Sequence, residues 1–189
     1  MTIIEERIRA RLVEDDRTVL QAALDELIKY RTQLADVPIQ TKPWLKAAKS
    51  YYGLTEYPGA KHNPKILEWW TKIRAPFTDD ETPWCAGYVG GVLEECGIVS
   101  SRKANARSYM QWGVKLNEPA VGCVVVCLRG SKSGWKGHVG FVVGQDRFGN
   151  LLVLGGNQGN KVSVKAFPQD RVLGYRWPKS APMPTETEL

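Results

Sequence analysis

Apolar and polar residues follow two different periods along this chain, and the change falls near residue 120. Before that point apolar residues recur every three to four positions, which is the period of an amphipathic helix. Residues 3 to about 35 show this period and are predicted to be helical. Two interpretations stay open for this segment: a solvated helix packed on the main domain, or an arm for oligomerisation or docking. Its apolar positions are Leu20, Ala23 or Leu24, Leu27, Ile28 and Leu34.

Four shorter helices are predicted between residues 44 and 112. Asn63 and Pro64 mark the start of one of them, because Asn is a favourable N-cap and Pro fits the first helical position. This helix is expected to extend through Ile73. The other three are expected at residues 44–52, 85–96 and 101–112.

After residue 120 the chain changes to short β-branched runs separated by turn residues. Consecutive short strands with tight turns indicate an antiparallel sheet, and helices followed by a sheet indicate an α+β fold. Five strands are expected, at residues 121–128, 138–143, 150–154, 161–167 and 172–177.

The same pattern predicts that the chain divides into three segments. An N-terminal amphipathic helical segment covers residues 1–36, and one domain covers residues 37–178. Residues 179–189 are rich in Pro, Thr and Glu, a composition that favours a flexible tail.

Composition narrows the class of partner. The chain has 189 residues and a net charge of +6, which favours an anionic partner. Nucleic acid is not expected, because the basic residues are spread along the chain instead of forming a stripe. We find no signal peptide and no apolar run near the ~18 residues that a membrane span needs. The protein is therefore expected to be made in the cytoplasm and to be a monomer.

Cys85 is the most informative residue for chemistry. It follows Pro83 and Trp84 and begins a predicted helix, whose N-terminus favours the thiolate over the thiol. A thiol nucleophile needs a general base, and the chain has only two histidines. His138 begins a predicted strand about 50 residues after the cysteine, whereas a structural role is expected for His62 beside its helix cap.

A third polar residue is needed to orient the base. The strand after His138 ends near Asn157, and a hairpin would bring this end beside the imidazole. Asn157 could then accept the imidazole N–H and fix the tautomer. Each residue also has a structural interpretation: a buried cysteine is often a small hydrophobe, and an asparagine after glycines is often a turn residue.

From Trp44 to Pro178 the chain resembles the CHAP branch of the NlpC/P60 superfamily, and more closely a group of phage endolysin-like cell-wall hydrolases. The resemblance implies a papain-like fold in which the helices precede a five-stranded antiparallel half-barrel. The stretches that carry it are Pro43-Trp44-Leu45, Glu56-Tyr57-Pro58-Gly59, His62-Asn63-Pro64, Trp84-Cys85-Ala86, Ala106-Arg107-Ser108-Tyr109, Gly137-His138-Val139-Gly140-Phe141, Gly155-Gly156-Asn157-Gln158 and Leu173-Gly174-Tyr175-Arg176-Trp177-Pro178.

The resemblance implies hydrolysis of a peptidoglycan amide bond. Cys85 would be the nucleophile, His138 the base and Asn157 the orienting residue, with Gln158 as a rival for that role. One departure is that Cys123 stands where related domains usually have an acidic residue. The residues expected to contact substrate are Trp84, Tyr88, Trp135 and Gln158.

No cofactor and no metal are expected. Asp79, Asp80 and Glu81 offer an alternative, because some CHAP domains bind calcium, but their spacing fits no EF-hand loop.

The function expected is therefore a peptidoglycan amidase or endopeptidase of a phage, acting as an endolysin for host lysis. It would act on the cell wall, in the periplasm, after release through a membrane pore or by a delivery machine. The alternatives are an injected antibacterial amidase toxin and a non-catalytic virion or wall-binding structural module.

Overall fold

The computed structural model describes residues 18, 19, 21, 22, 42–59, 61–131 and 133–184. The chain divides into two units, Met1–Gln40 and Thr41–Leu189. In the first unit the four described residues are helical, and the rest of the predicted N-terminal helix lies outside the described residues. The predicted domain boundaries after residues 36 and 178 stay predictions. In the predicted tail, the carbonyl of Pro182 accepts a hydrogen bond from the Trp177 indole at 2.8 Å.

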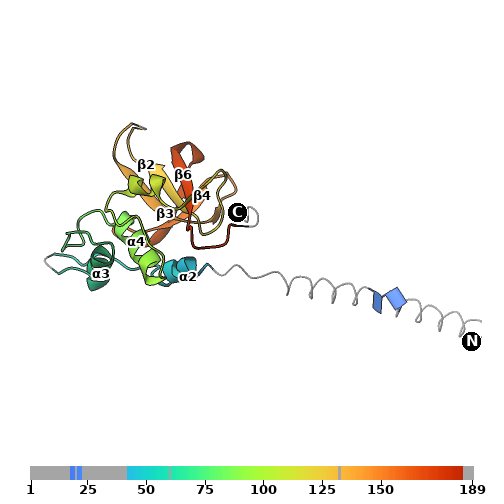
Figure 1. The fold of residues 1–189 in the computed structure, drawn as a ribbon, viewed down its shortest axis with the longest axis horizontal. Helices are drawn as coiled ribbons and strands as arrows, with labels where there is room; N and C mark the ends of the chain where they lie inside the picture. Colours follow the sequence, from blue (N-terminus) through green and yellow to red (C-terminus); the bar gives the residue numbers. More distant parts are fainter. Residues whose placement is uncertain (1–17, 20, 23–41, 60, 132, 185–189) are drawn as a thin grey trace, which may run out of the picture. The chain divides into compact units, whose positions relative to one another are not determined.

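Three α-helices belong to the second unit. Helix α2 covers Pro43–Ser50, α3 covers Pro64–Lys72 and α4 covers Cys85–Glu95. Asn63 caps α3 as predicted: its side chain accepts a hydrogen bond from the Lys65 N–H, and Pro64 takes the first helical position. Helix α4 lies between the sheet on one side and α2 and α3 on the other (Figure 1).

Helix α4 can take this central position because its surface is apolar and because its glycines let neighbouring elements approach closely. Its first nine residues are all buried, and they include three glycines. A Cβ atom at Gly91 would lie 2.0 Å from the Trp69 ring of α3, so the two helices approach too closely for any other residue there. The helix pair is therefore held by aromatic side chains of α3 lying against glycines of α4.

The α+β class is confirmed, and the described residues form one antiparallel sheet of six strands, one more than predicted. The strand order is β1-β6-β2-β3-β4-β5. Strand β3 is central and carries His138, which pairs with Cys127 of β2. The bounds are Val114–Leu116 for β1, Val124–Leu128 for β2, Gly137–Gln145 for β3, Leu151–Gly155 for β4, Ser163–Phe167 for β5 and Val172–Trp177 for β6.

Two predictions were wrong in the segment between α4 and the sheet. The expected helix at residues 101–112 is a 3-10 helix confined to Ala106–Gln111, because Asn105 is extended and its side chain caps Arg107. The additional strand β1 has only three residues, too few for an alternating pattern to be visible. It pairs along its whole length with the last strand, β6, which supplies the long-range contact that defines it.

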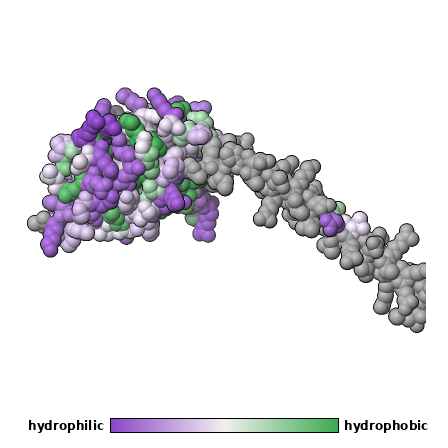
Figure 2. All heavy atoms as spheres, turned by 60° about the horizontal axis from the view of Figure 1, so that its bottom comes forward, coloured by the Kyte–Doolittle hydropathy of each residue, from purple (hydrophilic) through white to green (hydrophobic). Residues whose placement is uncertain are grey.

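The core fills the space between α4 and the sheet. Tyr88 of α4 meets Phe141 of β3 with ring centroids 6.1 Å apart, and Trp44 of α2 meets Trp177 of β6 at 5.2 Å. On the face shown in Figure 2, hydrophilic side chains cover most of the second unit and hydrophobic ones form small patches. Among the described residues, no helix has both the length and the apolar character needed to cross a bilayer.

Candidate active site

Cys85 is the first residue of α4, as the sequence predicted. Cys85 is only 5% exposed, and it lines a cleft of about 270 Å³. The sulfur interacts with the backbone N–H of Val139, the residue that follows His138 on β3. The helix start and the central strand therefore bring the thiol and the imidazole into the same part of the molecule.

The protonation state of Cys85 depends on two opposing effects. Burial raises the pKa of the Cys85 thiol, because a thiolate loses its hydration there. The N–H of Val139, the charge of Arg129 and the N–H groups at the helix start act in the opposite direction but do not cancel it. The thiol is therefore neutral at rest, contrary to what the helix N-terminus alone would favour.

His138 is held on two sides. Its Nε2 lies 3.0 Å from Oε1 of Gln158, and its ring stacks on Phe167 of β5 with centroids 5.2 Å apart and planes 5° apart. The residue is 1% exposed. A Cβ at position 155 would lie 2.8 Å from Nε2, so Gly155 leaves the room that the imidazole and the Gln158 amide occupy.

The surroundings of Gln158 determine the tautomer of His138. The Gln158 amide nitrogen donates to the carbonyls of Ser163 and Val153, the latter at 3.3 Å, which orients Oε1 toward the imidazole. Since Oε1 can only accept, Nε2 of His138 carries the proton and Nδ1 carries the lone pair. Within the described part of the chain, this buried Nδ1 has no hydrogen-bond partner. It is the nitrogen that can serve as a base.

The two candidates for the orienting role are placed differently. Gln158 contacts His138, whereas the Asn157 side chain donates to Glu56 Oε1 at 2.7 Å. Asn157 has a left-handed backbone, with φ 54°, and this turns its side chain away from the imidazole. The geometry therefore assigns the orienting contact to Gln158 and corrects the expectation for Asn157.

His138 is neutral over a wide pH range. Burial lowers the pKa of its imidazole to about 4, because the charged form loses its hydration. The positive charges of Arg129, Lys165 and Arg171 act in the same direction, and the hydrogen bond with Gln158 opposes them. At neutral pH the imidazole is therefore uncharged.

The aromatic residues expected to contact substrate separate into two groups. Trp84 and Tyr88 are fully buried, and their polar atoms donate to Glu56 and to the carbonyl of Ala48. They belong to the core, which corrects the prediction of a substrate contact. Trp135 is 72% exposed and lines the same cleft as Cys85, together with Arg129 and Lys136. This cleft can receive an anionic substrate with an apolar or sugar face.

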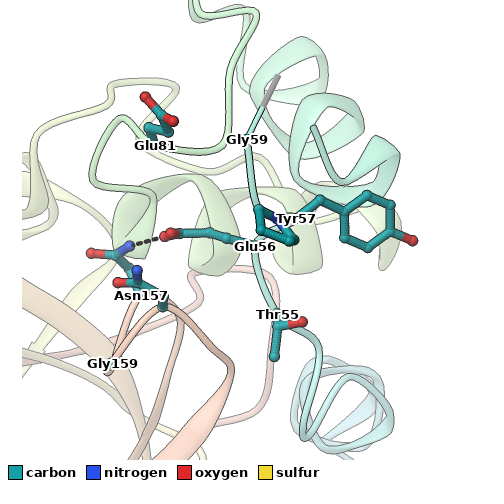
Figure 3. Close-up of a pocket in the computed structure, with 9 residues that line it drawn as sticks. Thr55, Glu56, Tyr57, Gly59, Glu81, Asn157 and Gly159 are labelled. Atoms are coloured by element: carbon teal, nitrogen blue, oxygen red, sulfur yellow. Dashed lines mark hydrogen bonds between the residues drawn. The ribbon is translucent and has the colours of Figure 1, made fainter. Parts of the chain in front are cut away.

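A second and larger cavity, of about 590 Å³, is lined by the segments 55–59 and 157–160 and by Glu81 (Figure 3). Glu81 lines this cavity, whereas Pro83 and Cys85 line the cleft. Glu56 and Asn157 form part of its wall and are hydrogen-bonded to each other there.

The acidic run before Cys85 has structural contacts. Asp80 is fully buried and accepts hydrogen bonds from the backbone N–H groups of Tyr57 and Asn63, at 2.9 and 2.8 Å. His62 lies 3.0 Å from its other oxygen. Asp79 accepts from Thr82. In the described ranges, no group of three or more His, Cys, Asp or Glu side chains is placed to hold a metal ion.

Three residues of the site were not identified from the sequence. Phe167 stacks on the imidazole, Arg129 lies in the cleft, and Glu56 connects Trp84 with Asn157. No pattern marks Phe167 or Arg129, since one is an ordinary strand residue and the other begins a loop. Glu56 belongs to one of the stretches that carry the family resemblance, Glu56-Tyr57-Pro58-Gly59, but nothing in the sequence relates it to Cys85.

Comparison with known proteins gives one family model and one solved structure. The family model of the CHAP domain matches residues 77–157, a range that contains Cys85, His138 and Asn157. A solved structure described as similar to lipoprotein, NLP/P60 family, from Staphylococcus aureus subsp. aureus Mu50 is 15% identical, with a TM-score of 0.42. That similarity covers 71% of this chain and 40% of the other, so this chain spans less than half of its length. No curated protein sequence matches the chain.

Proposed function

We propose that this protein, which carries a CHAP domain over residues 77–157, is a peptidoglycan hydrolase that cleaves an amide bond of the wall through Cys85. The observation that supports the assignment most directly is the state of His138. Its Nε2 is occupied by Gln158, and its Nδ1 carries a lone pair in the part of the core that contains the thiol. A thiol and an oriented neutral imidazole on two contacting elements, α4 and β3, are the groups that a cysteine hydrolase requires.

The reaction follows from these groups. His138 Nδ1 takes the proton of Cys85 as the sulfur attacks the amide carbonyl, forming the C–S bond and an oxyanion. The Cys85 N–H at the helix start can donate to that oxyanion, and one such donor contributes roughly 2.7–4 kcal/mol in other enzymes. His138 then gives its proton to the leaving amine as the C–N bond breaks. Water attacks the thioester, His138 takes one proton of that water, and the proton returns to sulfur as the C–S bond breaks.

The charge of the cleft supports an anionic substrate. Arg129 and Lys136 line it beside the exposed Trp135, and its lining includes no Asp or Glu. Peptidoglycan stem peptides carry carboxylates, and its sugars offer faces that stack on an indole. Both an N-acetylmuramoyl-L-alanine amidase and an endopeptidase would use this chemistry. Mass spectrometry of the released muropeptides identifies the bond that is cut.

Replacing the nucleophile tests the proposal. Cys85→Ala should abolish the loss of turbidity of purified Gram-negative sacculi, because no other group described in the cleft can form the thioester. Cys96→Ala is the matched control: Cys96 is also a free cysteine and lies at the other end of α4, so this variant should keep full activity. Activity retained by Cys85→Ala would contradict the proposal.

A second candidate function is a non-catalytic wall-binding or virion structural module. The burial and raised pKa of the Cys85 thiol favour it, since a core cysteine has the same properties. Clearing of sacculi separates the two candidates: a cysteine hydrolase should clear them and should lose that activity in proportion to any alkylation of Cys85. A wall-binding module would bind sacculi without clearing them, whether or not Cys85 is labelled.

For the biological setting, we propose a phage endolysin that acts as a monomer on the wall after release from the cytoplasm. An injected antibacterial toxin would use the same chemistry and differ only in delivery. Expression within a host, with and without a co-expressed pore-forming protein, tests the route of release: the protein should lyse the cell only when the pore is present.

A further inference from the structure

One carboxylate oxygen connects the two chain segments that carry the site. Glu56 Oε1 accepts a hydrogen bond from Trp84 Nε1 at 2.7 Å and another from Asn157 Nδ2 at 2.7 Å. Figure 3 shows the second of these, with the Glu56 and Asn157 side chains pointing toward each other. Trp84 directly precedes Cys85, and Asn157 directly precedes Gln158.

The two donors are close-packed neighbours of the reacting groups. A Cβ at Gly156 would lie 2.5 Å from the Trp84 ring, and a Cβ at Gly155 would lie 2.8 Å from His138 Nε2. The segment 155–158 therefore lies between Trp84 and His138. A shift of either donor would move Cys85 or Gln158 relative to the imidazole.

Glu56 is itself fixed by its surroundings. Its backbone N–H donates to the carbonyl of Asn160 at 3.0 Å, and Thr55 forms a β-bridge with Lys161. The following residue, Tyr57, donates its N–H to the buried Asp80 carboxylate at 2.9 Å. The carboxylate is thus presented from a rigid segment, and its hydrogen bonds come from two uncharged donors.

We propose that Glu56 is a positioning residue for the Cys85–His138 pair. It holds the helix start and the Gln158 segment at a fixed separation, so that Gln158 keeps His138 as the Nε2–H tautomer and Nδ1 stays available to the thiol. The inference rests on the proposed function, because it concerns how Cys85 reacts. Glu56 would influence the reaction through its hydrogen bonds with Trp84 and Asn157, without touching the substrate.

The test uses Glu56→Ala and Glu56→Gln in the full chain. Glu95→Ala is the matched control, because Glu95 also accepts a tryptophan indole hydrogen bond, from Trp69 at 3.2 Å, at the opposite end of α4. We expect Glu56→Ala to lower kcat on the order of 10- to 100-fold with little change in KM, since small misplacements of reacting groups have effects of this size. Glu56→Gln keeps one acceptor oxygen and should recover part of kcat. Glu95→Ala should lower the melting temperature and leave kcat unchanged.

A second readout is independent of hydrolysis. The chain has only two histidines, so ¹⁵N-histidine labelling resolves the two rings by NMR, with His62 as the internal reference. The wild type and Glu95→Ala should show His138 as a single Nε2–H tautomer, and Glu56→Ala should show a mixture. An unchanged tautomer together with a kcat like that of Glu95→Ala would overturn the inference. Absence of hydrolysis in the wild type would overturn the proposed function alone, because the NMR comparison still tests Glu56.

Discussion

At the scale of single residues, burial outweighs the helix N-terminus at Cys85. The helix start and the Val139 N–H favour the thiolate, but loss of hydration raises the pKa of the thiol further than they lower it. The same loss of hydration lowers the pKa of His138 to about 4. Cys85 and His138 are thus both neutral at pH 7.

The lowered pKa of His138 predicts a pH dependence of stability. The folded-state pKa is about 4 and the reference value is 6.5, so the unfolded state binds the additional proton between these limits. The contribution of neutral His138 to the free energy of unfolding is fully present above pH 6.5 and is lost as the pH falls through 4. In this window the free energy of unfolding should fall by up to ~1.4 kcal/mol for each pH unit.

His138→Asn should remove this contribution. Urea unfolding at several pH values between 4.5 and 7.5 measures it as the difference in slope between the wild type and the variant. Equal slopes would mean that the imidazole titrates with its ordinary pKa in the folded protein.

The sequence predicted that Cys85 begins a helix and that His138 lies at the start of a strand, but it could not rank Asn157 and Gln158 as partners of the imidazole. Adjacent residues point in opposite directions, and the left-handed backbone at Asn157 decides which of them faces the imidazole. The burial of Trp84 could not be foreseen either. Its indole needs Glu56 as an acceptor, and that residue lies 28 positions earlier in the chain.

At the scale of elements, the position of α4 depends on its glycines. Gly91 faces the Trp69 ring of α3, where a Cβ would lie 2.0 Å from the nearest ring atom. Because the ring is fully buried, it has no solvent-filled space into which to move. The close approach of these two helices therefore depends on the absence of a side chain at Gly91.

Gly91→Ala should destabilise the protein, although alanine is the better helix former. Overpacking costs about 1–3 kcal/mol in cores, and the gain in helix propensity offsets it by ~1 kcal/mol at most. Chemical denaturation measures the net loss. Combined with Trp69→Leu, the substitution should cost less than the sum of the two separate losses, because both act on the same contact. Additive losses would show that the helices separate freely.

The longer elements were predictable because each has a period or a cap of its own. Asn63 and Pro64 predicted the start of α3, and the β-branched runs predicted strands β2 to β6. The short elements were not, because their definition comes from distant partners. Strand β1 exists through its pairing with β6, and the 3-10 helix at Ala106–Gln111 packs against strands that follow it in the chain.

At the scale of the whole molecule, the described residues of the candidate site all lie in the second unit. Its buried core lies between Trp44 and Trp177, and all the residues of the cleft lie in the same range. The described core includes no residue of the first unit, Met1–Gln40. Folding and chemistry should therefore be separable from that segment.

A chain that begins at Thr41 should keep its melting temperature and its activity on sacculi in solution. It retains Lys42, whose ammonium lies 6.0 Å from the centre of the Trp177 ring. Calorimetry and the turbidity assay check the two expectations. A large loss of melting temperature would assign the first unit to the main domain, and a change in mass by light scattering would assign it to assembly.

The burial of Cys85 also has a consequence for redox chemistry. Oxidation to the sulfenic acid requires a thiolate that an oxidant can reach, and Cys85 offers a neutral sulfur in a residue that is 5% exposed. All four cysteines are free, so the fold depends on no disulfide. The Cys85 thiol should therefore react slowly with peroxide in the folded protein.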